Sequence, residues 1–190
     1  MPPQAKFTEA EIIDAALEIV RKNGFSSLTA RALGAELGSS ARPVFTVFRS
    51  MEEVQQAVIN KAKSLYSSYI DKGLSMPKAF KGVGTQYILF SIKEPKLFQL
   101  LFMREQKQIS GITEILPIID NNYEKILSSI NSDYGIQGEC AQKLYRHMWI
   151  YTHGIATLCA THMCRFTPEE ISEMISEAAI CLLKGMRQEQ

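Results

Sequence analysis

The sequence predicts an all-α protein of about nine helices, with an N-terminal three-helix helix-turn-helix head and a larger helical body. Two observations support this fold class. Apolar residues recur at intervals of three and four along most of the 190 residues, which is the period of an amphipathic helix. Only one segment, VFTVF at Val44–Phe48, has the β-branched and aromatic composition of a strand, and no second segment is suited to pair with it.

Capping residues bound the first two helices. Thr8 followed by Glu11 is a capping box, and the apolar spacing after it predicts a helix over residues 8–23 that stops at Gly24. Thr29 is suited to cap a short second helix, ARALGAEL, which Gly38 ends.

The stretch GSSARPVFTVF, residues 38–48, is then expected to form the third helix. Ser40 would be its N-cap and Pro43 would lie in the first turn, where an amide has no intrahelical partner. Three apolar side chains are expected to turn inward: Val44, Phe45 and Phe48. Arg42 and Thr46 would point outward from the end that reads bases in recognition helices. The alternative is a buried third helix in a small bundle.

The remaining pattern predicts six further helices, mostly longer. They cover residues 50–74, 76–94, 95–106, 113–131, 139–163 and 167–187. Pro77, Pro95 and Pro168 suit first turns, and Thr167 with Glu170 forms another capping box. We expect a domain of residues 1–50 and a body of residues 51–190, connected by the helix over residues 50–74.

The composition is that of a soluble globular protein, with 46% hydrophobic and 22% charged residues. A formal net charge of +1 means that any basic surface must come from the arrangement of the charges. The start, MPPQAKFTEAE, lacks an apolar signal segment, and the four cysteines lack CxxC spacing. We therefore expect a cytoplasmic protein with reduced thiols.

Several short motifs coincide in the N-terminal part. They are I-x-x-A-A at residues 12–16, Gly24-Phe25, Leu28-Thr29, Leu37-Gly38-Ser39, and P-V-F-x-x-F at residues 43–48. Together they resemble the DNA-binding domain of the TetR family of transcriptional regulators, over residues 8–59. The resemblance implies a homodimer that contacts its partner through the last two helices. It also implies a repressor of palindromic operator DNA that a small molecule releases.

Nine residues form the expected DNA-binding set: Thr29, Arg31, Ser39, Ser40, Arg42, Pro43, Phe45, Thr46 and Arg49. In the resemblance, Thr29 and Thr46 match phosphate-contacting positions. Arg42 is the candidate for reading a base, and a phosphate contact or a solvated side chain is equally open. Phe45 and Met51 depart from the family's usual tyrosine and lysine, which removes two phosphate anchors. A helical small-molecule binding protein with weakened DNA binding is therefore the main alternative.

A second resemblance lies in the body. PKLFQLLF at residues 95–102 and W-x-x-x-H-G from Trp149 resemble a TetR subgroup marked by Trp, His and Gly. Trp149 and His153 are four apart and share a helix face. The expected ligand-binding residues are Tyr87, Phe98, Phe102, Tyr123, Trp149 and His153. The alternative is an ordinary core tryptophan beside a hydrogen-bonded buried histidine.

Cys159, His162 and Cys164 raise the alternative of a metal- or thiol-sensing regulator. Their spacing does not match a four-ligand zinc motif, so packed thiols are the favoured interpretation. The sequence shows no phosphate loop, dinucleotide fingerprint or nucleophile elbow, and we expect no enzyme, catalytic residue, metal or cofactor. The last two helices carry wide apolar faces, which fit either an intramolecular core or a dimer interface.

Overall fold

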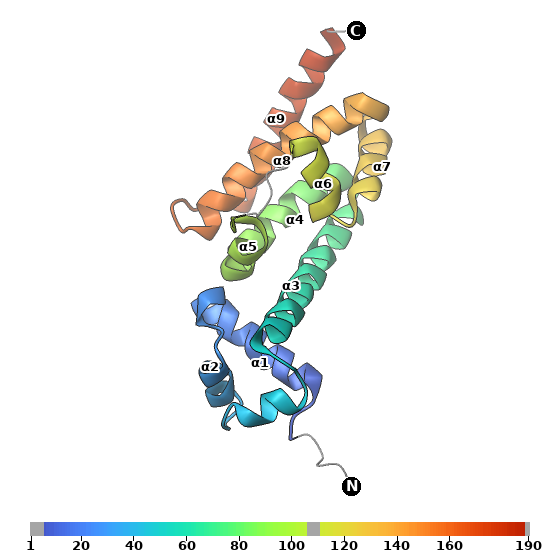
Figure 1. The fold of residues 1–190 in the computed structure, drawn as a ribbon. Coiled ribbons are helices and arrows are strands. Elements are labelled where there is room, and N and C mark those ends of the chain that lie inside the picture. The colour runs from blue at the N-terminus through green and yellow to red at the C-terminus, as the bar shows by residue number, and fades with distance from the viewer. Residues whose placement is uncertain (1–5, 106–110, 189–190) are drawn as a thin grey trace. The chain divides into compact units, whose positions relative to one another are not determined.

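The computed structural model describes residues 6–105 and 111–188 and shows an all-α protein (Figure 1). Nine α-helices and two short 3-10 helices, with no strand, make up the regular structure of the described residues. The predicted fold class is therefore confirmed. Residues 1–5, which belong to the N-terminal stretch, and Gln106, the expected end of one helix, lie outside the described residues.

The chain forms two compact units. Met1–Leu65 and Glu94–Arg104 form unit 1, whereas Tyr66–Lys93 and Glu105–Gln190 form unit 2. The long helix α3 (Met51–Leu74) contributes its first part to unit 1 and its last part to unit 2. The chain thus passes from one unit to the other within the helix that the sequence marked as a connector.

Unit 1 begins with α1 (Glu9–Asn23), η1 (Phe25–Ser27) and α2 (Ala30–Glu36). The capping box at α1 is confirmed, because the Glu11 carboxylate accepts from the Thr8 N–H at 2.8 Å and the Thr8 hydroxyl accepts from the Glu11 N–H. α1 stops at Gly24, whose φ of 85° is readily adopted only by glycine. The core of unit 1 contains Ile12, Val20, Leu33, Val54, Val58, Leu97 and Phe98.

The third helix is shorter and tighter than expected. It is a 3-10 helix, η2 (Arg42–Thr46), and its N-cap is Ala41 and not Ser40. The Ser39 N–H donates to the Gly34 carbonyl at 2.8 Å, so this part of the chain closes the turn after α2 before the next helix begins. The expectation that Ser40 caps the helix was therefore wrong.

Phe45 also differs from its expected position. Val44 is 0% and Phe48 is 5% exposed, as an inner face requires, but Phe45 is 43% exposed. Because η2 ends at Thr46, no continuous helix runs from Phe45 to Phe48, and the two side chains do not share one helical face. The core of unit 1 therefore uses two of the three predicted residues, and Phe45 faces solvent.

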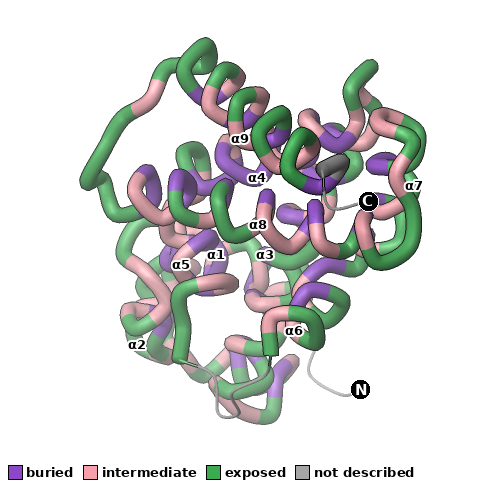
Figure 2. The backbone as a smooth tube through the Cα atoms, turned by 90° about the horizontal axis from the view of Figure 1, so that it is seen from above, coloured by how far each residue is buried: buried purple, intermediate pink, exposed green. Residues whose placement is uncertain are grey.

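Unit 2 is built around α4 (Ala79–Lys93), which packs against α7 (Tyr123–Tyr134), α8 (Gly138–Ala160) and α9 (Pro168–Gln188). Figure 2 shows buried turns along α4 and α8. The end of α3 contacts α4 backbone to backbone: a Cβ on Gly73 would lie 2.7 Å from the Gly82 carbonyl carbon. These two glycines bring the helices closer than any side chain would allow.

The single helix predicted over residues 113–131 is two helices, α6 (Ile112–Ile119) and α7. Asp120 ends α6 in an extended conformation (φ −126°, ψ 105°), and its Oδ1 accepts from the Asn122 N–H at 2.9 Å. This side-chain bond replaces the helical ladder, as Asp and Asn often do at turns. The break places the Asp120 side chain inside unit 2, where it is 2% exposed.

The C-terminal helices begin as predicted. At α9, the Thr167 N–H donates to Glu170 Oε2 at 2.7 Å and Thr167 Oγ1 accepts from the Glu170 N–H at 3.2 Å, so this capping box is confirmed. α8 ends at Ala160, three residues before the expected Met163. Among the described helices, none is both long and apolar enough to cross a bilayer.

Candidate DNA-binding surface and effector cavity

The nine expected DNA-binding residues lie on α2, on η2 and on the turns that flank them. Seven of them are exposed, and Ser39 and Pro43 are half-buried. Thr29 is the N-cap of α2, and its hydroxyl accepts from the Ala32 N–H at 3.2 Å. Thr46 donates to the Pro43 carbonyl at 2.6 Å. The backbone thus orients the two threonine hydroxyls, and each oxygen keeps further hydrogen-bonding capacity.

The positive charge of this region is unpaired. Arg31, Arg42 and Arg49 are exposed, and none of their guanidinium groups takes part in an ion pair or hydrogen bond among the described residues. Exposed, unpaired guanidinium groups are available to bind phosphate.

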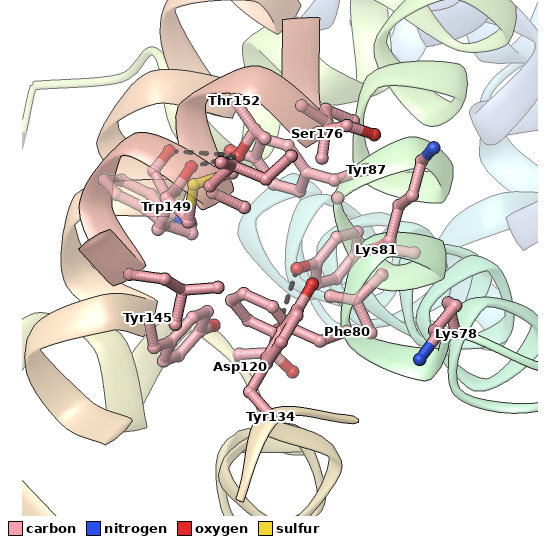
Figure 3. Close-up of a pocket in the computed structure, with 18 residues that line it drawn as sticks. Lys78, Phe80, Lys81, Tyr87, Asp120, Tyr134, Tyr145, Trp149, Thr152 and Ser176 are labelled. Atoms are coloured by element: carbon pink, nitrogen blue, oxygen red, sulfur yellow. Dashed lines mark hydrogen bonds between the residues drawn. The ribbon is translucent and has the colours of Figure 1, made fainter. Parts of the chain in front are cut away.

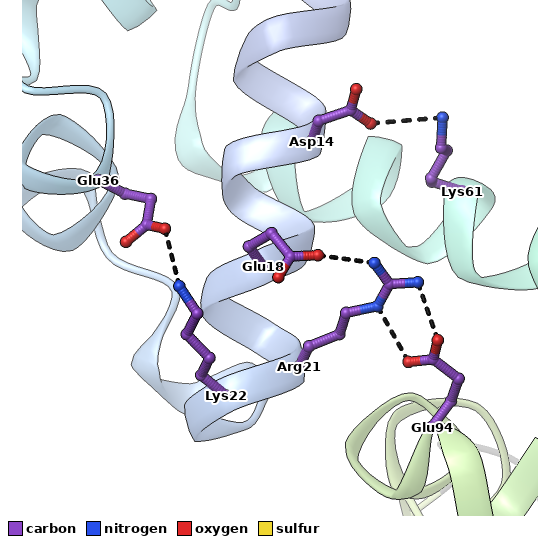
Figure 4. Close-up of polar contacts among 7 residues, drawn as sticks. All are labelled: Asp14, Glu18, Arg21, Lys22, Glu36, Lys61 and Glu94. Carbon is purple, nitrogen blue, oxygen red and sulfur yellow. Dashed lines mark hydrogen bonds and ion pairs between the residues drawn. The ribbon is translucent and has the colours of Figure 1, made fainter.

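Three other basic residues of unit 1 are neutralised by acids, as Figure 4 shows. Arg21 contacts Glu18 and Glu94, Lys22 lies 3.1 Å from Glu36, and Lys61 lies 3.4 Å from Asp14. These pairs involve α1, α2, α3 and the start of α5 (Pro95–Phe102). Arg31, Arg42 and Arg49 therefore supply positive charge that no acid among the described residues pairs with, although the net charge of the chain is close to zero.

Gly34 has a structural role in the turn between α2 and η2 that was not expected from the sequence. A Cβ at this position would lie 2.7 Å from the Ala41 nitrogen and 2.8 Å from the Ser40 carbonyl carbon. Only glycine lets the turn between α2 and η2 approach this closely. The sequence did contain a signal for this close approach. A glycine in the middle of a seven-residue helix lowers helix stability by about 1 kcal/mol relative to alanine, which indicates that a larger residue would not fit there.

Unit 2 encloses a cavity of about 320 Å³ (Figure 3). Six aromatic side chains line it: Tyr66, Phe80, Tyr87, Tyr134, Tyr145 and Trp149. α9 contributes apolar side chains, among them Ile175, Ala179 and Leu183. The polar lining consists of Lys78, Lys81, Asp120, Thr152 and Ser176. The size and the mainly apolar lining with a few polar groups are typical of a small-molecule site.

Asp120 is the buried acid of this cavity. Tyr66 Oη donates to its Oδ2 at 3.0 Å, and the Tyr145 hydroxyl is a second donor. Burial raises the pKa of Asp120, and its hydrogen bonds from Asn122 and the two tyrosines offset part of that increase. Burial and, after it, the Asp120 carboxylate hold the pKa of Tyr66, Tyr87 and Tyr145 well above the ordinary tyrosine value.

Comparison with known proteins assigns the helix-turn-helix part. A sequence model of the tetR family of bacterial regulatory proteins matches residues 12–58. Residues 12–58 are a TetR-family domain. The match covers most of α1, together with α2, η2 and the start of α3.

Two solved structures are similar in fold. One is from Clostridium perfringens and is described as a candidate fatty acid metabolism regulator; it has a TM-score of 0.62 and 16% identity, over 92% of this chain and 97% of that one. The other is described as a candidate TetR-family transcriptional regulator from Mesorhizobium loti; it has a TM-score of 0.53 and 16% identity, over 92% and 94% of the two chains. No curated protein sequence matches the chain significantly. At this identity, the likeness shows a shared fold.

The structure brings together two of the six expected ligand-binding residues, because Tyr87 and Trp149 both line the cavity. His153 is not in the lining; its Nδ1 lies 2.8 Å from Tyr87 Oη, and its ring stacks on Trp149 at 4.8 Å. Burial lowers the pKa of His153. Tyr123 is not in the lining either, and its ring lies 5.6 Å from that of Tyr145.

The remaining two expected residues, Phe98 and Phe102, lie on α5, which belongs to unit 1 with the TetR-family domain. Their rings are 5.1 Å apart, and Phe98 is fully buried in the core of that unit. The cavity of unit 2 is therefore lined without them, and the sequence grouped aromatic residues that belong to different cores.

The lining that the sequence analysis missed had a partial signal. Tyr145 lies four residues before Trp149 and Thr152 three residues after it, so both share its helix face. Asp120 had no comparable signal, because the sequence placed it inside a continuous helix. Helix spacing therefore identifies lining residues on α8 but not those from other elements.

The cysteine and histidine residues near the end of α8 do not assemble a cluster. Cys159 is buried, whereas His162 and Cys164 are exposed. Among the described residues, no group of three His, Cys, Asp or Glu side chains is placed to hold a metal ion. The cysteines are free thiols. Nothing in this geometry supports the metal-sensing alternative.

Proposed function

We propose that this chain is a ligand-responsive transcriptional repressor that binds palindromic operator DNA as a homodimer and is released by a small molecule. The observation that carries the proposal is the TetR-family domain with three exposed, unpaired arginines on and beside its helix-turn-helix. In this proposal Arg42, at the start of η2, reads a base or anchors a phosphate, and Arg31 and Arg49 bind phosphates.

The cavity of unit 2 is the proposed effector site. It is lined by Trp149, whose indole Nε1–H is buried with no acceptor among the described residues. The lining also includes Tyr66 of α3, the helix whose first part belongs to unit 1. A ligand beside Tyr66 would thus touch the element that continues into the TetR-family domain.

Dimerisation is proposed through α8 and α9. Ile150 of α8 and Ile180 of α9 are 51% and 50% exposed, and Tyr151 is 37% exposed. Large apolar side chains at this exposure on two adjacent long helices are suited to a twofold interface. A twofold dimer would present two recognition helices to the two half-sites of a palindrome.

Release is proposed as a population shift. The ligand must bind more tightly to the conformation that does not fit the operator, since equal affinity for both conformations would change nothing.

A gel shift with DNA from immediately upstream of the chain's own gene tests the DNA-binding part. We expect a complex at about 50 mM salt that weakens strongly by about 200 mM, because phosphate contacts release counterions. The absence of a salt-sensitive complex with any upstream fragment would contradict the proposal. It would favour the alternative of a helical small-molecule binding protein, in which Phe45 and Met51 replace phosphate anchors.

A further inference from the structure

The cavity contains a buried carboxyl group that has no cationic partner among the described residues. Asp120 is 2% exposed, and none of the ion pairs formed among the described residues includes it. A buried carboxylate is normally paired with a cation, because hydrogen bonds alone recover only part of the lost hydration. Here Asp71, a second acid, also raises its pKa.

The groups around Asp120 hold it in place without neutralising it. Two tyrosine hydroxyls and one backbone N–H donate to its oxygens, and all three donors are uncharged. These bonds fix the carboxylate in one orientation at the cavity wall. The carboxylate of Asp120 therefore has hydrogen-bond donors but no positively charged partner among the described residues.

The rings beside Asp120 favour a cation as well. Tyr66 and Tyr87 meet edge to face at 6.0 Å, and Phe80 lies 6.4 Å from Tyr145. Their π faces are negative and attract ammonium groups within about 6 Å. The apolar side chains of α9 line the same cavity and offer a surface for a hydrocarbon body.

The two lysines of the lining do not supply the missing charge. Lys81 Nζ donates to Ser172 Oγ at 2.7 Å, and Lys78 is exposed. Figure 3 shows both ammonium groups at one edge of the lining, apart from Asp120. An anionic ligand held there would form ion pairs close to solvent, where such pairs contribute little.

We infer that the effector is a lipophilic amine, with its ammonium group on Asp120 among the tyrosine rings and its apolar body against α9. This inference rests on the proposed function, because it names the chemical class of the ligand for the proposed effector site. It assigns Asp120 as the residue that selects for charge.

Trp149 provides the measurement, since it is the only tryptophan of the chain and it lines the cavity. Quenching of its fluorescence in the purified full-length protein reports binding without any DNA. Three probes share one hydrocarbon body and differ in charge: n-decylamine, 1-decanol and decanoate. We expect decylamine to bind about tenfold or more tightly than decanol, and decanoate to bind most weakly.

Asp120→Asn should lower the affinity for decylamine about tenfold while leaving that for decanol within about twofold. Glu139→Gln is the matched control, because it removes an exposed acid of the same unit that does not line the cavity, and it should change neither affinity by more than about twofold. Circular dichroism checks the fold of each variant. The ratio of amine to alcohol affinity in the unmodified protein tests the inference independently of any variant.

Two outcomes would overturn the inference, and they are distinguishable. If decanol or decanoate binds as tightly as decylamine, or if Asp120→Asn leaves decylamine binding unchanged, the effector site stands and the amine assignment falls. If none of the three probes affects Trp149, the cavity is not an effector site. In that case the ligand-responsive part of the proposed function falls with the amine assignment, whereas DNA binding is still decided by the gel shift.

Discussion

Arg21 of α1 holds Glu94 in a two-point contact, with Nε and Nη2 each 2.9 Å from one carboxylate oxygen. The Glu94 side chain is only 16% exposed, and it immediately precedes α5. Burial lowers the pKa of Arg21, but the hydrogen bonds that its guanidinium group donates to Glu18 and Glu94 outweigh this effect and raise the pKa. The pair ties the first helix of the TetR-family domain to α5, which returns to unit 1 after α4 (Figure 4).

Glu94→Gln should therefore destabilise unit 1. The change removes the charge and one of the two hydrogen bonds, and we expect a loss of about 1–2 kcal/mol in the free energy of unfolding. Urea unfolding measures it. Glu18→Gln is the control, since its side chain is 43% exposed and its single contact with Arg21 should contribute less. An equal loss of stability in both variants would show that the two-point contact between Arg21 and Glu94 stabilises the protein no more than the single contact with Glu18 does.

Gly34→Ala should disturb the turn between α2 and η2. The new methyl group would meet backbone atoms of Ser40 and Ala41 that cannot move aside like a side chain, and a cost of about 1–3 kcal/mol is expected. Weaker DNA binding should accompany it. Gly154→Ala in α8 is the control, because its Cβ would meet nothing within 4 Å and the change should be neutral or stabilising. If both substitutions change the free energy of unfolding equally, the close approach of the backbone at Gly34 does not require glycine.

Phe45→Tyr should tighten DNA binding. Phe45 is 43% exposed on the outer side of η2, so an added hydroxyl would be able to reach a phosphate. One hydrogen bond of about 1 kcal/mol corresponds to roughly fivefold in affinity. Fluorescence anisotropy with labelled upstream DNA measures the change. Unaltered affinity would mean that no phosphate lies within reach of residue 45.

The ionisation of Asp120 should make the free energy of unfolding depend on pH. Its pKa is raised in the folded state, so its ionisation favours the unfolded chain. The contribution of Asp120 to the free energy of unfolding is therefore largest below the ordinary aspartate pKa. It is lost as the pH rises through the raised pKa of the folded state. The free energy of unfolding of the unmodified protein minus that of Asp120→Asn should fall over this interval and then level off. A difference that increases with pH would mean that the pKa is lowered.

Much of the fold could be predicted from residues that are close together in the sequence. The capping boxes at Thr8 and Thr167 and the stop at Gly24 depend on residues within one turn of each other, and all three are confirmed. The strand-like VFTVF was assigned to a helix because no partner strand existed. Its inner and outer faces were only partly predicted, since the helix ends at Thr46 and does not continue to Phe48.

The cavity was much harder to predict from the sequence than the helices were. Its acid ends a helix that the periodicity extended through residue 131, and it meets tyrosines from α3 and α8. Such a meeting depends on tertiary packing, which helix spacing does not encode. Aromatic content similarly could not show that Phe98 belongs to the core of unit 1 and Tyr87 to that of unit 2.

The most direct test of the DNA-binding account is the salt dependence of DNA affinity in a variant that carries Arg31→Ala, Arg42→Ala and Arg49→Ala together. The slope of log affinity against log salt should decrease by about one for each phosphate contact removed, so by about two to three in total. Arg165→Ala, which removes an exposed arginine of unit 2, should leave the slope unchanged. A slope for the triple variant equal to that of the unmodified protein would contradict the assignment of these arginines as the DNA-binding surface.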